Sequence, residues 1–185
     1  MRPALRFMSL LTLAFLLSAC ATSGLLTTND PAQGVFVYGY FDMSKAGREA
    51  KHVVVGSNQN MPIGTRWGLY KLNEKGHFAV RNLEPSYVYR VKGIMGVSET
   101  YNFGPDLDEG FILKPSPGDM IYVGAYRYVP HQRTGRDVLS NSGSFSLEPA
   151  RDMSETEVLR MVRDSVRDEH WARRIDERLG QLARR

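Results

Sequence analysis

The sequence predicts a mainly β protein, an antiparallel sandwich of seven to eight strands followed by a short C-terminal helical hairpin or arm. Two observations carry this prediction. Between residues 34 and 149, short β-branched and aromatic runs alternate with segments rich in Gly, Pro, Asn and Asp, which is the spacing of a sandwich. From residue 150 onward, the apolar period changes to about 3.6 residues, which is the period of an α-helix.

Eight runs have the composition of strands, and turn signals such as Asn73-Glu74-Lys75-Gly76 separate them. The runs are 35–41, 52–55, 66–72, 77–80, 87–91, 110–113, 120–126 and 145–147. Side chains alternate between the two faces of a strand. We therefore expect Trp67 and Leu69 on one face of their strand and Tyr70 on the other.

The C-terminal tail, residues 150–185, begins with a helix-start signal. Ser154 and Glu157 form a capping box, in which each side chain satisfies the backbone N–H of the other residue. Two apolar stripes follow, and the gap of five residues between them breaks the helical phase. Their members are Val158, Leu159, Val162 and Val166, then Trp171, Ile175, Leu179 and Leu182. This pattern predicts two helices, at about 155–165 and 168–183, with one continuous helix as the alternative.

The first 19 residues have the organisation of a signal peptide. Arg2 and Arg6 form a basic region, and residues 7–17 form an apolar run of about 11 residues, well short of the roughly 20 that a spanning helix needs. Cys20 follows at the expected cleavage site and is the only cysteine of the chain. Export compartments are oxidising, and small exported domains often contain disulfides. A chain with a single cysteine cannot form an intramolecular disulfide, so its fold must be stable without one.

The residues Leu17-Ser18-Ala19-Cys20 resemble the lipobox of bacterial lipoproteins. This resemblance implies cleavage before Cys20, a lipid on its sulfur and acylation of its new amino group. Ala21 in place of aspartate implies sorting to the outer membrane, facing the periplasm, with surface exposure left open. The alternative is an ordinary secretory signal with a chance cysteine. Residues 20–33 are interpreted as the lipidated cysteine and a flexible tether, because 21–33 are small, polar and proline-containing.

Residues 69–91 (LYKLNEKGHFAVRNLEPSYVYRV) resemble part of a carboxypeptidase-regulatory or transthyretin-like β-sandwich. In this pattern Gly76 permits the positive φ of a hairpin turn, and Phe78 and Val80 point inward on alternate positions. Leu83 then closes the end of the sandwich. The resemblance implies an accessory or binding module rather than an enzyme.

The charge of the chain argues against a nucleic-acid partner. The formal net charge is +4, and two of those charges, Arg2 and Arg6, leave with the signal peptide. Neither the 20–150 segment nor the tail is strongly basic, and no run of Lys and Arg forms a stripe that could track a phosphate backbone.

The chain has few of the residue patterns that mark catalysis or metal binding. Its histidines are His52, His77, His131 and His170. None of them are spaced as metal ligands on one element, so we expect no metal and no cofactor. A G-x-S-x-G nucleophile elbow and a phosphate-binding glycine loop are both missing from the sequence. We therefore predict no enzymatic activity, with a hydrolase assembled from distant residues such as His131 and Asp137 as the alternative.

The tyrosines are the most suggestive remaining feature. Three pairs at i,i+2 spacing lie within expected strands, so each pair occupies one strand face. The pairs are Tyr38 and Tyr40, Tyr87 and Tyr89, and Tyr126 and Tyr128. If exposed, these faces would form a platform for sugars or for a protein partner. We expect the tyrosines to belong to the core or its rim and Trp171 to anchor the tail onto the sheet, so the exposed platform is the alternative.

These observations combine into one functional hypothesis. The chain is expected to be anchored to the membrane through Cys20 and to act as a non-catalytic binding or scaffold module, with an envelope protein or a cell-wall glycan as partner. The alternative is a glycan- or peptidoglycan-binding module that uses Tyr38, Tyr40, Tyr87 and the other paired tyrosines.

Overall fold

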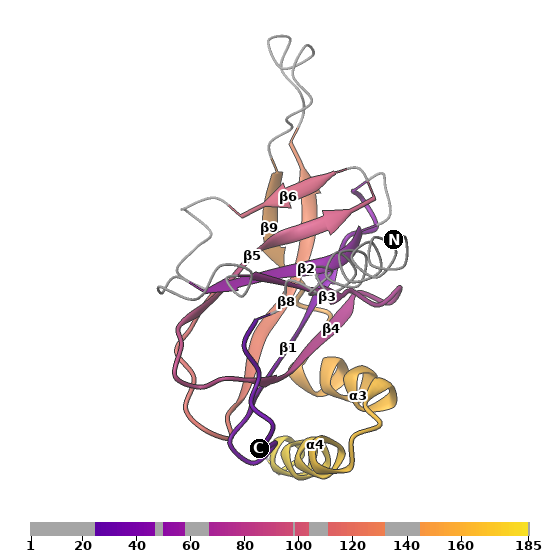
Figure 1. Cartoon of the computed structure of the whole chain (residues 1–185). Helices are drawn as coiled ribbons and strands as arrows, with labels where there is room; N and C mark the ends of the chain where they lie inside the picture. Colours follow the sequence, from indigo (N-terminus) through magenta and orange to yellow (C-terminus); the bar gives the residue numbers. More distant parts are fainter. Residues whose placement is uncertain are drawn as a thin grey trace, which may run out of the picture.

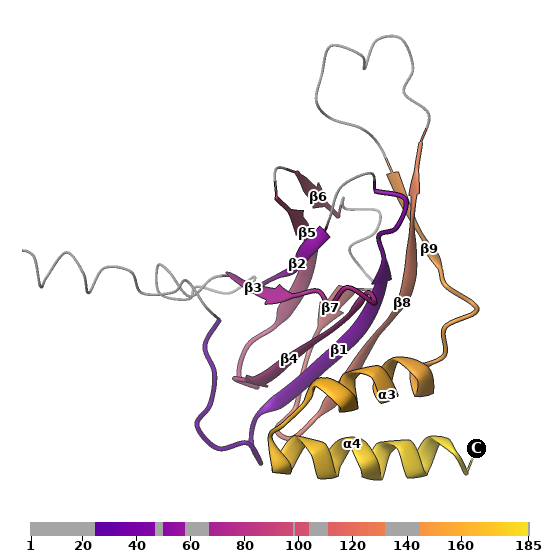
Figure 2. The same ribbon diagram turned by 90° about the vertical axis from the view of Figure 1, so that its right-hand side faces the viewer.

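The computed structural model describes residues 25–46, 50–57, 67–97, 99–103, 111–131 and 145–184. Within these residues, nine strands form two sheets that pack face to face, and two helices form a third layer (Figures 1 and 2). The predicted mainly β sandwich with a short helical hairpin is confirmed. The predicted signal peptide and Cys20 lie outside the described residues.

One sheet, here called the covered sheet, carries the helices on its outer face. Its strands are β4 (His77–Leu83), β1 (Val35–Asp42), β8 (Met120–Pro130) and β9 (Phe145–Pro149), in that order. Strand β1 is buried on both sides, since Val35 and Val37 face the space between the sheets while Phe36 and Tyr38 face the helices. This double burial explains why its sequence is almost continuously apolar.

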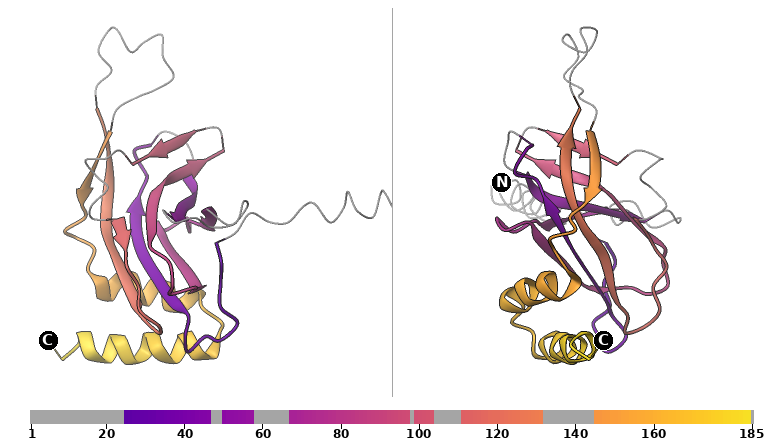
Figure 3. Two further views of the ribbon diagram at one scale, coloured as in Figure 1. Left: turned by 60° about the vertical axis from the view of Figure 1, so that its left-hand side comes forward. Right: turned by 180° about the vertical axis from the view of Figure 1, so that it is seen from behind.

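The other sheet, here called the uncovered sheet, has no described element over its outer face (Figure 3). Its strands are β3 (Trp67–Lys71), β2 (Ala50–Ser57), β5 (Tyr89–Gly96) and β6 (Thr100–Asn102), with β7 (Ile112–Leu113) also paired to β5. The predicted alternation of β3 is confirmed. Trp67 and Leu69 are exposed, whereas Tyr70 packs against the core between the sheets.

Strand pairing in the described residues is antiparallel with one exception. Strands β1 and β8 are parallel neighbours in the middle of the covered sheet. All other pairs in both sheets run antiparallel, as the sequence predicted. The sequence did not predict this exception, because the relative direction of two strands depends on how the chain connects segments that lie far apart in the sequence.

Each of the eight predicted strand runs overlaps an observed strand, and the three-residue β6 was not predicted. Strand β5 begins at Tyr89 rather than at residue 87, and β8 extends to Pro130 rather than ending at residue 126. Gly76 has a φ of 88°, so the positive-φ turn before β4 is confirmed. Phe78 and Val80 lie in the core between the sheets, as predicted.

Residues 25–33 correct the prediction of a flexible tether over 20–33. Leu25 is buried, and Thr27 forms an antiparallel bridge with Leu83 at the end of β4. The Thr28 N–H donates to the Asn82 carbonyl over 2.9 Å, and the Glu84 N–H donates to the Leu26 carbonyl over 3.1 Å. The segment is polar in composition, but its backbone satisfies the free edge of β4 and is thereby held on the fold.

The two helices match their predicted positions closely. Helix α3 spans Glu155–Ser165 and α4 spans Glu169–Leu182. The capping box forms, with the Glu157 N–H donating to the Ser154 hydroxyl over 3.3 Å and the Ser154 N–H donating to the Glu157 carboxylate over 2.8 Å. Both helices lie against the outer face of the covered sheet and do not extend away from it (Figure 2).

Candidate functional site

The structure places most of the aromatic residues proposed as ligand contacts in the interior. Tyr38, Tyr89 and Trp171 are fully buried, and Tyr128 is only 9% exposed. Tyr40, Tyr87 and Tyr126 are half-buried and pack against the two core clusters. These tyrosines thus belong to the core or its rim, as expected, and they do not form a platform of exposed pairs.

Tyr38 lies at the centre of a polar cluster that joins the sheet to both helices. Its hydroxyl donates to Oε1 of Glu155 over 2.7 Å. The guanidinium of Arg178 donates to the same carboxylate oxygen over 2.8 and 3.0 Å. Burial, strengthened by the Glu155 carboxylate, raises the pKa of Tyr38 well above its usual value, so the hydroxyl stays protonated and remains a donor. This cluster fastens the helices to the covered sheet.

Tyr89 has a structural role of a kind known from β-sandwiches. Its hydroxyl donates to the carbonyl of Glu84, five residues earlier, over 2.6 Å. A tyrosine that bonds back to the backbone at the start of a strand is a tyrosine corner, which fixes the turn between two strands of a sandwich. The residue that was considered as a ligand contact therefore holds the 84–89 turn in place.

Trp171 anchors the tail on the sheet, as expected. Its ring lies 5.0 Å from that of Phe36, and its indole N–H donates to Oδ1 of Asn82 over 2.6 Å. Asn82 has a φ of 57°, a left-handed conformation that asparagine tolerates better than most residues. The sequence did not predict that Asn82 would accept a hydrogen bond from Trp171. The signal that the sequence offers for Asn82 is its position just before the turn that contains Pro85.

The best candidate for a binding site is a cleft of about 780 Å³ at one end of the sandwich. It lies where β1 ends, β2 begins and the turn between β3 and β4 passes. Its lining includes Tyr40, Asp42, His52, Lys71 and Lys75. An aromatic ring, cationic groups and a carboxylate therefore meet in one opening, which suits a polar ligand or a peptide side chain that carries charge.

The cleft is lined by two acidic residues, Asp42 and Glu74, and electrostatics keep the Asp42 carboxylate charged. Burial alone would raise the pKa of Asp42, but hydrogen bonds from Ser44 and the contact with Arg127 outweigh it, so the pKa lies below its usual value. The Arg127 guanidinium donates to Asp42 over 3.0 Å and also to both carboxylate oxygens of Asp152, over 2.9 and 3.0 Å. Asp42 thus links the cleft to the segment that leads into α3.

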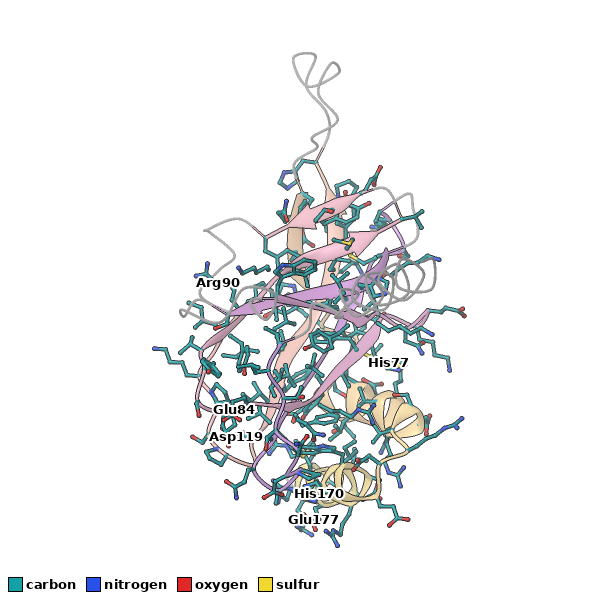
Figure 4. All side chains as sticks on the ribbon, in the orientation of Figure 1. His77, Glu84, Arg90, Asp119, His170 and Glu177 are labelled. Atoms are coloured by element: carbon teal, nitrogen blue, oxygen red, sulfur yellow. The ribbon has the colours of Figure 1, made fainter. Side chains whose placement is uncertain are left out.

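The histidines do not gather into one site. His77 lies on β4 and His170 on α4, well apart in Figure 4. His131 is exposed directly after β8, and Asp137, its partner in the hydrolase hypothesis, lies outside the described residues. In the part of the chain that the structure describes, no group of three or more His, Cys, Asp or Glu side chains could hold a metal ion.

No described helix is long and apolar enough to cross a bilayer. No protein-family model, curated protein or solved structure matches the chain significantly.

Proposed function

We propose that this chain is a lipid-anchored envelope lipoprotein of the bacterial outer membrane, facing the periplasm, and that its sandwich is a non-catalytic binding or scaffold module. The observation that carries the proposal is Cys20, the single cysteine, placed directly after Leu17-Ser18-Ala19 and an apolar run of signal-peptide length. Cleavage before Cys20 would remove none of the described residues, because the first of these is Leu25.

The binding part of the proposal is supported by the cleft beside β1, β2 and the β3–β4 turn. A partner that offers both a carboxylate and a cationic group could pair with Lys75 and Asp42 there. An envelope protein fits this mixed charge better than a neutral sugar does. A glycan partner keeps some support from Tyr40, the one predicted tyrosine that lines the cleft.

The anchor is tested by metabolic labelling with a fatty-acid analogue and by fractionation of the envelope. We expect the wild-type chain to carry the label and to fractionate with the outer membrane. Cys20→Ser should lose the label, whereas Ser23→Ala, three residues further on, should keep it. Label that persists in Cys20→Ser, or a wild-type chain without label, would disprove the lipid anchor.

The binding role is tested by crosslinking and pull-down from envelope extracts and by pelleting with purified cell wall. We expect a protein partner that is captured by the wild-type chain and lost when Lys75→Glu reverses one charge of the cleft. Arg173→Glu, an exposed charge reversal on α4, serves as the matched control. Pelleting with cell wall that is lost in Tyr40→Ala would instead identify the glycan alternative.

A further inference from the structure

The uncovered sheet presents large apolar side chains to solvent. Trp67 is 41% exposed and Leu69 is 38% exposed, and both lie on the edge strand β3. Val54 of β2 is paired with Leu69 and is only partly buried, so the apolar patch continues onto the second strand. Exposed tryptophan and leucine side chains that share one face mark an interaction surface.

The charged side chains in the strands of the same sheet are all cationic, and two of them, Lys71 and Lys92, are exposed. Its five strands contain Lys51, Lys71, Arg90 and Lys92 and no aspartate or glutamate. Lys92 lies across Gly56, the β2 residue that pairs with Trp67, so a cation is placed beside the apolar patch. The covered sheet and the helices carry both signs of charge, with ion pairs such as Arg163–Asp176 joining α3 to α4.

The described chain begins next to this sheet. The hydroxyl of Tyr70, on β3, shares a hydrogen bond with the backbone of Leu25. Figure 2 shows the indigo N-terminal segment reaching β3 on the side of the molecule away from the helices. Leu25 is held there by burial and by the pairing of Leu26 and Thr27 with the end of β4.

Leu25 follows Cys20 by five positions, with four residues between them, and five residue steps span at most about 18 Å when fully extended. A lipid on Cys20 would therefore hold β3 within that distance of the membrane. Sheets in a sandwich lie about 10 Å apart and a helix layer adds about 10 Å more, so the helices form the most distant layer. Among the described residues, the outer face of the uncovered sheet combines the exposed Trp67 and Leu69 with the exposed lysines Lys71 and Lys92.

We infer that the outer face of the uncovered sheet lies on the lipid surface of the membrane, with Trp67 and Leu69 in the interface and Lys71 and Lys92 against anionic headgroups. Tryptophan prefers the membrane–water interface, and cations are attracted to anionic lipid. The inference rests on the proposed lipid anchor, because the anchor brings the face to the membrane. The occupant is lipid rather than a second copy, whose identical face would set cation against cation.

The test uses the full chain, expressed with its own leader, purified in lipidated form and reconstituted into vesicles of equal parts phosphatidylethanolamine and phosphatidylglycerol. Brominated acyl chains quench tryptophan that reaches the lipid. Because Trp67 is one of two tryptophans and Trp171 is buried, we expect the brominated vesicles to remove up to about half of the emission. Trp67→Phe should abolish this quenching and leave the protein anchored.

Charge variants separate the contribution of the cations from that of the anchor. Lys71→Glu with Lys92→Glu should reduce the quenching, whereas Arg160→Glu with Arg173→Glu, which reverses two exposed charges on the helices, should not. Flotation with the vesicles and the mass of the Cys20 peptide report the anchor independently.

The outcomes are distinct. Lipidated protein that floats with the vesicles but shows no quenching would overturn the inference and leave the lipid anchor intact. Leu69→Cys protein that forms a disulfide-linked dimer on the vesicles would also overturn it, in favour of a second copy. A Cys20 peptide without lipid would overturn the proposed function and, with it, the inference.

Discussion

At the scale of single residues, Asn82 joins the strand, the N-terminal segment and the helical tail. Its carbonyl accepts from Thr28, its side chain accepts from Trp171, and its backbone is left-handed. The Cα of Asn82 also lies where a side chain on Gly34 would collide with it, at 2.9 Å from an added Cβ. One residue thus connects three parts of the chain through different groups.

Substitution of Asn82 separates its hydrogen bond from its conformation. Asn82→Gly keeps the left-handed backbone but leaves the buried indole N–H without an acceptor, which should cost roughly 1–3 kcal/mol. Asn82→Ala should cost about 1 kcal/mol more, because alanine is strained at positive φ. Urea denaturation measures both, with Asn102→Ala on the exposed side of β6 as the control. Equal stability of the Gly and Ala variants would contradict the conformational part of this prediction.

His77 predicts a pH dependence of stability. It is 5% exposed, and neither ring nitrogen has a hydrogen-bond partner among the described residues. Burial lowers the pKa of His77, Lys75 lowers it further, and Asp164 of α3 acts in the opposite direction. A histidine with a lowered folded pKa binds fewer protons in the native than in the unfolded state. Stability is therefore present above the unfolded value of 6.5 and is lost as the pH falls below it.

The measurement is the urea midpoint as a function of pH. We expect the midpoint to fall between about pH 7 and pH 5 in the wild type and to fall less in His77→Gln, which cannot be protonated in this range. His131→Gln, at an exposed position, should behave as the wild type does. An unchanged pH profile in His77→Gln would show that another group carries the effect.

At the scale of elements, local signals predicted the helices better than the sheets. Ser154 and Glu157 fix the start of α3 by a contact between neighbours in sequence, and the tail therefore matched its prediction. The partner of β1 could not be predicted in the same way, because β8 lies about 80 residues away and pairs in parallel. The segment around Thr27 was interpreted as a tether from its composition, yet its place is decided by the edge of β4.

The candidate site was predicted less well than the fold. Pairs such as Tyr38 and Tyr40 were correctly assigned to single strand faces, but the sequence could not say that the helices would cover that face. The cleft draws its lining from three separate segments, including Asp42, His52 and Lys75. Its existence depends on how strand ends meet in space, which no local pattern encodes.

The helix pair should depend on Glu155 for its docking. Glu155→Ala would leave the Tyr38 hydroxyl and the Arg178 guanidinium without their shared acceptor, in a partly shielded place where the two charged side chains are 20% and 28% exposed. We expect a loss of about 2 kcal/mol and faster proteolysis of the tail. Glu155→Gln should recover part of the stability, because its carbonyl oxygen can still accept.

Glu177→Ala is the matched control for that experiment. Glu177 is 57% exposed and its oxygen lies 3.9 Å from Arg174, so its removal should change stability by less than about 0.5 kcal/mol. Equal losses for the two alanine variants would show that the position of Glu155 between sheet and helices does not matter.

At the scale of the whole molecule, the layers give the protein two different sides. The helices close one side by filling the apolar surface around Phe36 and Tyr38, and they carry charges of both signs outward. The uncovered sheet leaves Trp67 and nearby cations on the other side, next to the point where the described chain begins. If that side lies on lipid, the helical side points away from the membrane surface.

The length of the tether is the variable that tests this orientation. A flexible Gly/Ser insertion of about 20 residues after Ser23 would raise the typical span between Cys20 and Leu25 to roughly 27 Å, and the local concentration of the face at the membrane would fall. We expect the quenching of Trp67 by brominated lipid to decrease while the protein remains anchored. The same insertion placed after Leu182, beyond α4, should leave the quenching unchanged. Full quenching with the long tether would mean that the affinity of the face for lipid, rather than confinement by a short tether, sets the orientation of the molecule.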